Sequence, residues 1–428
     1  MKRIYVIILI WLVSFTGASA QSLEHLLDSL SAIYSFSYEK MEVDSNFTSK
    51  YLLQFEQAVD PDSPAGQTFR QRVFLSHKDF DAPVVFITEG YTAWHAEKPD
   101  FTSELAGLLN SNQICVEHRY FGTSVPDTLV WDQLTVAHAA ADHHRIVQVL
   151  KNLYKGKWIS TGISKGGQTT VYFRYFYPED VDISVPYVAP LNFSTEDQRV
   201  YLFLDQVDSE ECRDKIRQFQ TELIKNKAAF LPAFEKLANE KGLTYRMGIE
   251  KAFELTVLEY SFAFWQWGYF TCNDIPQDFT EKDSIIKHLD KVAGLKWISN
   301  EGIEELQPFF YQAMREMGFY GYDITPFKEW ISFTKNPTFE FTLPEGVHIT
   351  YEPELNEQAD CFVRHEAENM IFIYGANDPW SAPAVQLTYH TNSIKMVKPG
   401  GSHRTRIKDL TEGQQKQVMD TLSRWLDH

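Results

Sequence analysis

A serine between two glycines, where a strand-like run meets a helix-like run, constrains this chain more than any other feature. The motif G-I-S-K-G-G occupies residues 162–167 and follows the strand-like run 157–161. A sharp strand-to-helix turn of this kind exposes the serine hydroxyl, and its neighbours must be small because side chains there would collide with the adjoining strand or helix. Ser164 is therefore the candidate nucleophile. The alternative is an ordinary glycine-rich loop, so its chemical partners have to be found elsewhere in the chain.

Two polar residues late in the chain can complete a catalytic set with this serine. Asp378 follows the apolar run 370–375, and His403 follows the apolar run 394–397 and two glycines. The order serine, acid, histidine is that of α/β-hydrolases, in which each residue stands where a core strand gives way to a loop. We expect His403 to take the proton of Ser164 and Asp378 to orient the imidazole. A plain Asn-Asp-Pro turn and an ordinary loop histidine are the alternatives.

An oxyanion hole for such a site needs two N–H donors. One is expected from the backbone of Lys165, because it directly follows the nucleophile. The second is expected from the backbone of Gly90 or Tyr91, in the loop after the apolar strand 84–88.

The first twenty residues have the features of a secretory signal. Lys2 and Arg3 precede the apolar stretch 4–15, and residues 18–20 form a small-x-small cleavage pattern. The apolar stretch is too short to span a bilayer. We expect a mature chain that begins near Gln21, is exported to the periplasm or the extracellular space, and has no membrane attachment once the signal is removed.

The charge balance argues against several kinds of partner. The chain carries 40 basic and 58 acidic residues, a net charge of −18, and loses two basic residues with the signal. A protein this acidic repels nucleic acid and anionic membranes. No dinucleotide fingerprint or phosphate loop occurs, so we expect no cofactor. His138 and Asp142 stand four residues apart on one expected helix, but without the glutamate of a metalloprotease motif, so we expect no metal.

Strand-like and helix-like runs alternate along most of the chain. The strand-like runs are 50–57, 68–75, 84–88, 113–117, 157–161, 183–188, 370–375 and 394–397. This alternation predicts an α/β fold, the α/β-hydrolase fold, with a mostly parallel sheet and helices on both faces. A short helix at 23–33 precedes the strands, and the first two strands form a hairpin-like pair.

A long segment without strand signal interrupts the sheet. Residues 196–330 are predicted to be helical, and 338–367 irregular. We therefore expect a large helical cap between core strands 6 and 7, placed over Ser164. The expected organisation is a signal peptide at 1–20, the first part of the hydrolase core at 21–195, a mainly helical cap at 196–367, and the second part of the core at 368–428.

Four cysteines would meet an oxidising compartment after export. Cys115 falls in an apolar strand and is expected to be an inert buried thiol. A disulfide is expected among Cys212, Cys272 and Cys361, but the spacing leaves the pairing open.

Several segments resemble a family of secreted serine exopeptidases. They are T-E-G at 88–90, E-H-R-Y-F-G at 117–122, the serine motif at 162–167, N-D-P-W at 377–380 and G-G-S-H at 400–403. The chain most resembles the prolyl tri/tetrapeptidyl aminopeptidase family, and more distantly the prolyl carboxypeptidases and lysosomal dipeptidyl peptidases. The resemblance covers most of 50–190 and 370–404.

The resemblance implies hydrolysis of short peptides from a free amino terminus, releasing tri- or tetrapeptides after proline through an acyl-enzyme. Ser164, Asp378 and His403 match the positions of the catalytic triad. Lys165 stands where the carboxypeptidases usually carry tyrosine, so their substrate preference does not transfer. The segment around His118 and Arg119 is expected to be a structural charge cluster.

An aminopeptidase has to bind an ammonium group and, for this specificity, a proline ring. Glu89 and Glu259 are the candidate counter-charges for the ammonium. The candidate aromatic walls are Trp265, Trp267, Tyr269 and Trp380. The alternatives are solvated acids and ordinary core aromatics.

Other functions fit the same residues. A carboxylester hydrolase would use the same triad and fold. A prolyl carboxypeptidase-like enzyme would need a cation for the substrate carboxylate, and Lys165 is the nearest candidate. A non-catalytic binding protein is a third possibility, against which the intact set of Ser164, Asp378 and His403 argues.

Overall fold

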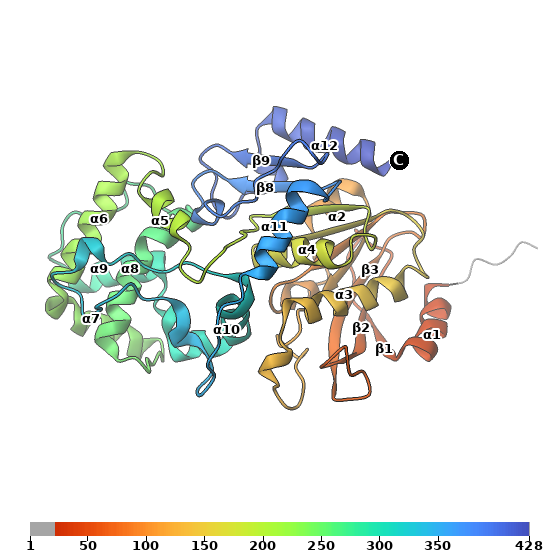
Figure 1. The fold of residues 1–428 in the computed structure, drawn as a ribbon, viewed down its shortest axis with the longest axis horizontal. Helices are drawn as coiled ribbons and strands as arrows, with labels where there is room; N and C mark the ends of the chain where they lie inside the picture. Colours follow the sequence, from red (N-terminus) through yellow and green to blue (C-terminus); the bar gives the residue numbers. More distant parts are fainter. Residues whose placement is uncertain (1–21, 428) are drawn as a thin grey trace, which may run out of the picture.

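The computed structural model describes residues 22–427, so the expected signal peptide at 1–20 lies outside the described residues. Among residues 22–427, no helix combines the length and the apolar character needed to cross a membrane. The described chain forms a core around one sheet and a group of cap helices beside it (Figure 1).

Nine strands of the described chain form one sheet in the order β1-β2-β3-β5-β4-β6-β7-β8-β9. Their bounds are β1 Phe36–Met41, β2 Ser49–Ala58, β3 Thr68–His77, β4 Val84–Thr88, β5 Asn112–Val116, β6 Trp158–Ile163, β7 Ile183–Tyr187, β8 Ile371–Gly375 and β9 Ile394–Lys398. The strands β1, β2, β3 and β5 pair antiparallel in that order, and the pairings from β5 through β4 to β9 are parallel. The predicted α/β-hydrolase sheet is confirmed.

Strand β1 was not predicted. It is an edge strand whose residues are mostly half-buried or exposed, so it carries little hydrophobic signal. Because β1 adds one strand at the start of the sheet, all later strands are numbered one higher than expected. The chain therefore leaves the sheet after β7, forms the cap, and re-enters the sheet at β8.

Helices cover both faces of the sheet, as predicted. The helices α1 (Leu23–Tyr34), α3 (Val136–Leu150) and α4 (Lys165–Phe176) contribute to the hydrophobic cluster on one face. The helices α2 (Glu104–Leu109) and α12 (Glu412–Leu426) contribute to the cluster on the other. Parallel strands buried on both faces place their carboxyl ends together, which is where ligands bind in open α/β sheets.

The cap is helical, and its helices lie beside the core on the left of Figure 1. They are α5 Gln198–Leu204, α6 Glu210–Lys225, α7 Lys227–Glu240, α8 Ile249–Trp267, α9 Lys282–Ala293 and α10 Asn300–Gln312. A disulfide joins Cys212 at the start of α6 to Cys272 after α8, whereas Cys115 is buried and Cys361 exposed, both as free thiols.

The prediction of an irregular segment at 338–367 was wrong for residues 354–365. Helix α11 (Glu354–His365) forms there and packs on α4 of the core. Its buried residues include Ala359, Phe362 and Val363, a helical spacing that is short and surrounded by charged residues. The helical periodicity was therefore present in the sequence, although the many charged residues lower the average hydrophobicity of the segment.

Candidate active site

The backbone at Ser164 has the strained geometry that the motif requires. Ser164 lies between β6 and α4 with φ 58° and ψ −121°, a conformation that L-residues seldom adopt. A Cβ at Gly162 or Gly166 would lie within 2.7 Å of the Thr88 carbonyl oxygen, so neither position has room for a side chain. The turn therefore presents the Ser164 hydroxyl at the carboxyl edge of the sheet.

The acid and the histidine meet at the same edge. Asp378 follows β8 and is fully buried, and its Oδ2 lies 2.7 Å from Nδ1 of His403, which follows β9. The backbone N–H of Trp380 donates to the other carboxylate oxygen at 3.2 Å. Because Nδ1 faces the carboxylate, Nε2 is the nitrogen left to exchange a proton.

Ser164 and His403 line one cavity. No hydrogen bond joins their side chains among residues 22–427. Such contacts are often long in substrate-free enzymes and tighten when substrate binds.

Two backbone amides are available as oxyanion donors. The N–H groups of Tyr91 and Lys165 have no hydrogen-bond partner within the described residues, and both residues line the cavity with Ser164. Gly90 does not line it, but a Cβ there would lie 2.6 Å from the Gly166 nitrogen. Of the two loop residues expected as donor, Tyr91 therefore has the suitable position, and Gly90 allows the close approach.

The cavity has a volume of about 700 Å³ and lies between the core and the cap. The core contributes Ser164, His403 and Trp380, and α8 contributes Glu259 and Trp267. Cavities of this size are typical of sites for small-molecule and peptide ligands.

The two candidate acids differ in their surroundings. Glu89 is paired, since its Oε1 lies 3.0 Å from Nε2 of His95 and 3.8 Å from the Cys115 thiol. These three ligand groups all lie within 4.8 Å of one another, near enough for a metal ion.

Glu259 has no such partner. It is 4% exposed, and its Oε2 accepts hydrogen bonds from the hydroxyls of Tyr320 at 2.9 Å and Tyr322 at 2.6 Å. Burial raises the pKa of Glu259 to about 8, and no basic side chain among residues 22–427 forms an ion pair with it. A buried carboxyl without a cation, in the wall of a cavity, is suited to bind one.

Only two of the four expected aromatic residues line the cavity. Trp267 and Trp380 do. Tyr269 does not line the cavity; it is 61% exposed and lies under the guanidinium of Arg404. Trp265 lies on the other side of α8, in a different pocket.

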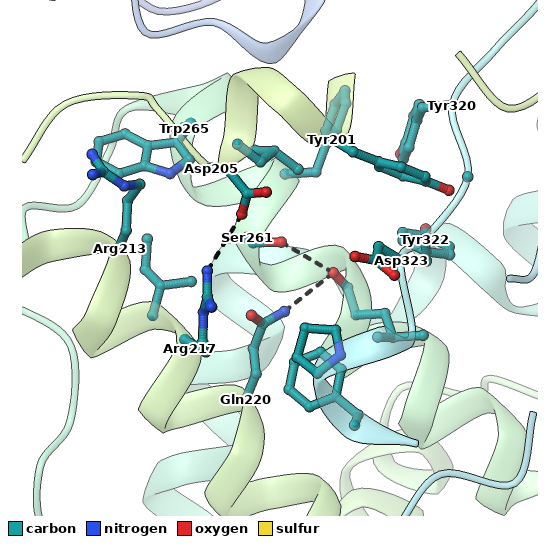
Figure 2. Close-up of a pocket in the computed structure, with 17 residues that line it drawn as sticks. Tyr201, Asp205, Arg213, Arg217, Gln220, Ser261, Trp265, Tyr320, Tyr322 and Asp323 are labelled. Carbon is teal, nitrogen blue, oxygen red and sulfur yellow. Dashed lines mark hydrogen bonds and ion pairs between the residues drawn. The ribbon is translucent and has the colours of Figure 1, made fainter. Parts of the chain in front are cut away.

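Figure 2 shows where Trp265 lies. It lines a separate pocket of about 100 Å³ together with Ser261, one helical turn before it on α8, and with the Arg217–Asp205 ion pair. Glu259 and Gln266, seven residues apart, lie toward the larger cavity. The helical period of 3.6 separates these faces, so neighbours in an aromatic run do not share a pocket.

A second aromatic wall, which was not predicted from the sequence, comes from the turn before α10, from α10 itself and from the segment after it. Its members are Trp297, Phe309, Phe319 and Tyr320. The clusters F-F-Y at 309–311 and F-Y-G-Y at 319–322 are visible in the sequence, but nothing local assigns them to a cavity.

The E-H-R segment is structural, as expected. Glu117 accepts hydrogen bonds from the Ala93 N–H at 3.1 Å and the Ser124 hydroxyl at 2.8 Å. Arg119 makes two hydrogen bonds to Asp142, at 2.7 and 2.8 Å. The Glu117 contact holds the loop after β4, and the Arg119 contact joins the segment to α3.

The strand order, the turn at Ser164 and the Asp378–His403 contact define an α/β-hydrolase with a helical cap. The sequence profile of the PS-10 peptidase S37 family matches residues 25–427. The chain belongs to this peptidase family, and the resemblance expected from its motifs is confirmed.

Two relatives and one solved structure illustrate the similarity. The prolyl tri/tetrapeptidyl aminopeptidase of Streptomyces mobaraensis is 32% identical over 384 residues, which cover 88% of this chain and 80% of that protein. The lysosomal Pro-X carboxypeptidase of Mus musculus is 30% identical over 166 residues, 35% of this chain and 34% of that protein. A 2-hydroxy-6-oxo-6-phenylhexa-2,4-dienoate hydrolase from Rhodococcus aligns with 87% of this chain and 99% of its own, with 12% identity and a TM-score of 0.39.

Proposed function

We propose that this protein is an exported serine exopeptidase that cleaves short peptides from their free amino terminus, releasing tri- or tetrapeptides after proline. The activity named for the Streptomyces mobaraensis relative supports this substrate class, because the similarity extends over 88% of the chain. The observation that carries the proposal is the buried, unpaired carboxyl of Glu259 in the same cavity as Ser164.

In this proposal Ser164 attacks the carbonyl carbon of the scissile bond. His403 takes the hydroxyl proton at Nε2, and Asp378 holds the imidazole through Nδ1 and stabilises its charged form. The amides of Lys165 and Tyr91 donate to the oxyanion. His403 then protonates the leaving amine, and water hydrolyses the acyl-enzyme by the same route.

Glu259 binds the substrate ammonium. The two tyrosine hydroxyls occupy Oε2, which leaves Oε1 for the ligand. A charge-assisted hydrogen bond in a desolvated site is strong, and the substrate cation supplies the partner that the buried carboxyl lacks. Trp267, Trp380 and Phe319 supply rigid aromatic surface for a proline ring.

Export is supported by the signal features of residues 1–20 and by the Cys212–Cys272 disulfide. Disulfides persist in oxidising compartments and are rare in the cytosol.

The test compares the rates of hydrolysis of a free-amino Ala-Ala-Pro anilide, of the same anilide with an acetylated amino terminus, and of a short-chain phenyl ester. The wild type should cleave the free-amino peptide and act poorly on the acetylated one. Glu259→Gln should lower kcat/KM for the free-amino peptide by at least about 30-fold, since removing one partner of a buried charge pair costs ~2–5 kcal/mol.

Glu89→Gln is the matched control, because Glu89 lines the same cavity but is already paired with His95. Equal cleavage of the free and acetylated peptides would contradict the proposal. Cleavage of the ester alone would move the protein to the carboxylester hydrolases.

Lys165, the cation expected to bind the substrate carboxylate in a carboxypeptidase, is not free to do so. The Lys165 side chain is 1% exposed and donates to the Gly90 carbonyl, so it does not present a free ammonium to the cavity.

A further inference from the structure

We infer that the Lys165 side chain is a positioning group of the oxyanion hole: it holds the Gly90–Tyr91 peptide so that the Tyr91 N–H points toward the reacting carbonyl oxygen. This inference deepens the proposed function and rests on it. Lys165 would then act twice, through its own backbone N–H and through the peptide that its side chain fixes.

The Lys165 ammonium is enclosed beside the loop. Its Nζ donates to the Gly90 carbonyl oxygen at 2.7 Å and lies 5.7 Å from the centre of the Tyr91 ring and 5.3 Å from that of Phe121. Among residues 22–427, no carboxylate forms an ion pair with it. Burial lowers the pKa of Lys165 well below its usual range, and either protonation state keeps an N–H to donate.

Peptide geometry carries the effect from one atom to the other. In a trans peptide the C=O and the N–H of the same unit point in opposite directions within one plane. The residues described contain no cis peptide, so fixing the Gly90 oxygen fixes the direction of the Tyr91 N–H. Tyr91 lines the cavity with Ser164, and its N–H has no partner among the described residues.

The loop needs this contact at Gly90 more than elsewhere. The Tyr91 carbonyl accepts from the His118 N–H at 3.2 Å, and the Ala93 N–H donates to Glu117 at 3.1 Å. These bonds secure the loop after the Gly90–Tyr91 peptide but not the peptide itself. Glycine has the widest conformational freedom of any residue, so this peptide can rotate unless its oxygen is bound.

A hydrogen bond at the carbonyl also polarises the peptide. Chains of hydrogen bonds strengthen one another in a low-dielectric interior. The Tyr91 N–H therefore becomes a better donor to a developing oxyanion than an unassisted amide would be.

The Lys165 side chain is expected to be costly for stability. A buried amine without an ion pair retains most of its desolvation penalty, and an apolar side chain of similar length avoids it. A positioning role therefore predicts that activity and stability change in opposite directions when the amine is removed, whereas a structural role predicts that both decrease.

The experiment compares Lys165→Met with Lys50→Met in the mature protein. Lys50 is the matched control because it is also 1% exposed, donates to a backbone carbonyl, that of Lys98 at 2.6 Å, and lies outside the cavity. Both variants lose one buried amine-to-carbonyl bond, but only one of these bonds belongs to the oxyanion loop.

We expect Lys165→Met to lower kcat on the free-amino Ala-Ala-Pro anilide by ~10²-fold, the usual effect of losing one oxyanion donor, with KM within about threefold of the wild type. Its affinity for a peptide aldehyde, which forms a tetrahedral oxyanion on Ser164, should fall in proportion to kcat/KM. The melting temperature should be equal to or above that of the wild type, and Lys165→Gln, which keeps an N–H donor, should have intermediate activity.

Lys50→Met should keep the wild-type kcat. An unchanged kcat in Lys165→Met, or a reduced kcat with unchanged affinity for the aldehyde, would overturn the inference. So would a failure to fold, since no ion pair is lost. A wild type that does not cleave free-amino peptides would instead overturn the proposed function.

Discussion

At the residue scale, Glu259 is a buried carboxyl in the wall of the cavity. Two tyrosine hydroxyls bind one oxygen, yet desolvation dominates and raises the pKa from 4.5 to about 8. An acid with a raised folded-state pKa binds a proton that the unfolded chain releases, so between pH 4.5 and 8 this group makes the folded state less stable as pH rises.

Glu259→Gln should remove this pH dependence. The free energy of unfolding of the variant should rise relative to the wild type from pH 5 to pH 8, because only the wild type has to bury a charge there. Urea unfolding of both proteins at several pH values across this window measures the difference. Burial raises the pKa of Glu316 to about 7, but this residue titrates in both proteins, so its effect on stability cancels in the difference. Parallel stability curves would contradict the assigned pKa.

At the element scale, the end of α8 supports the loop that carries the histidine. The His403 N–H donates to the Gln266 carbonyl at 2.8 Å, and the Trp267 ring lies edge-on 6.0 Å from the His403 ring. Gly268 ends the helix at φ 59°, and a Cβ there would lie 2.9 Å from Cβ of Ser402. A helix of the cap therefore helps to position a residue of the core site.

Gly268→Ala should displace the histidine loop and lower kcat by at least about tenfold, since misplacement by ~1 Å can cost 10²-fold. Gly242→Ala is the control, because Gly242 also has a left-handed backbone, at φ 67°, but a Cβ there meets nothing within 4 Å. Both variants should lose about 1 kcal/mol of stability to backbone strain. Steady-state kinetics beside thermal unfolding separates the two effects, and equal kcat values would show that the contact with Ser402 is unimportant.

At the scale of the whole molecule, cap and core share one hydrophobic interior. A single buried cluster includes Phe219 and Phe264 of the cap, Tyr172 of α4, and Phe372 of β8. The cap is thus not an appendage with a separate core, and we expect cap and core to unfold together.

Removing the disulfide should therefore shift one common transition. The Cys212–Cys272 bond spans 60 residues, for which loop entropy predicts a contribution of ~4 kcal/mol. In a chain of this size, losing this contribution should lower the melting temperature of the double variant Cys212→Ala, Cys272→Ala by ~5 °C. Calorimetry should show one peak moved to lower temperature, whereas Cys361→Ala, at an exposed free thiol, should leave it in place. A separate early transition would show that the cap unfolds alone.

Local patterns in the sequence were enough for the α/β-hydrolase fold, the family and the candidate nucleophile. The serine turn, the alternation of strands and helices, and the chain order of Ser164, Asp378 and His403 are properties of short segments, because backbone sterics and hydrophobic periodicity act over a few residues. The prediction missed β1, where that signal is weak, and also missed α11, whose apolar residues keep a helical spacing among many charged ones.

What only the tertiary structure decided depends on contacts between distant segments. Such contacts decide whether Glu89 or Glu259 has a free carboxyl and which side of α8 Trp265 faces. They also decide which cysteines pair and that Lys165 reaches the Gly90 carbonyl. Burial and long-range hydrogen bonding set the pKa values and orientations of these groups. The neighbours of these residues in the sequence do not specify the distant partners that they acquire on folding.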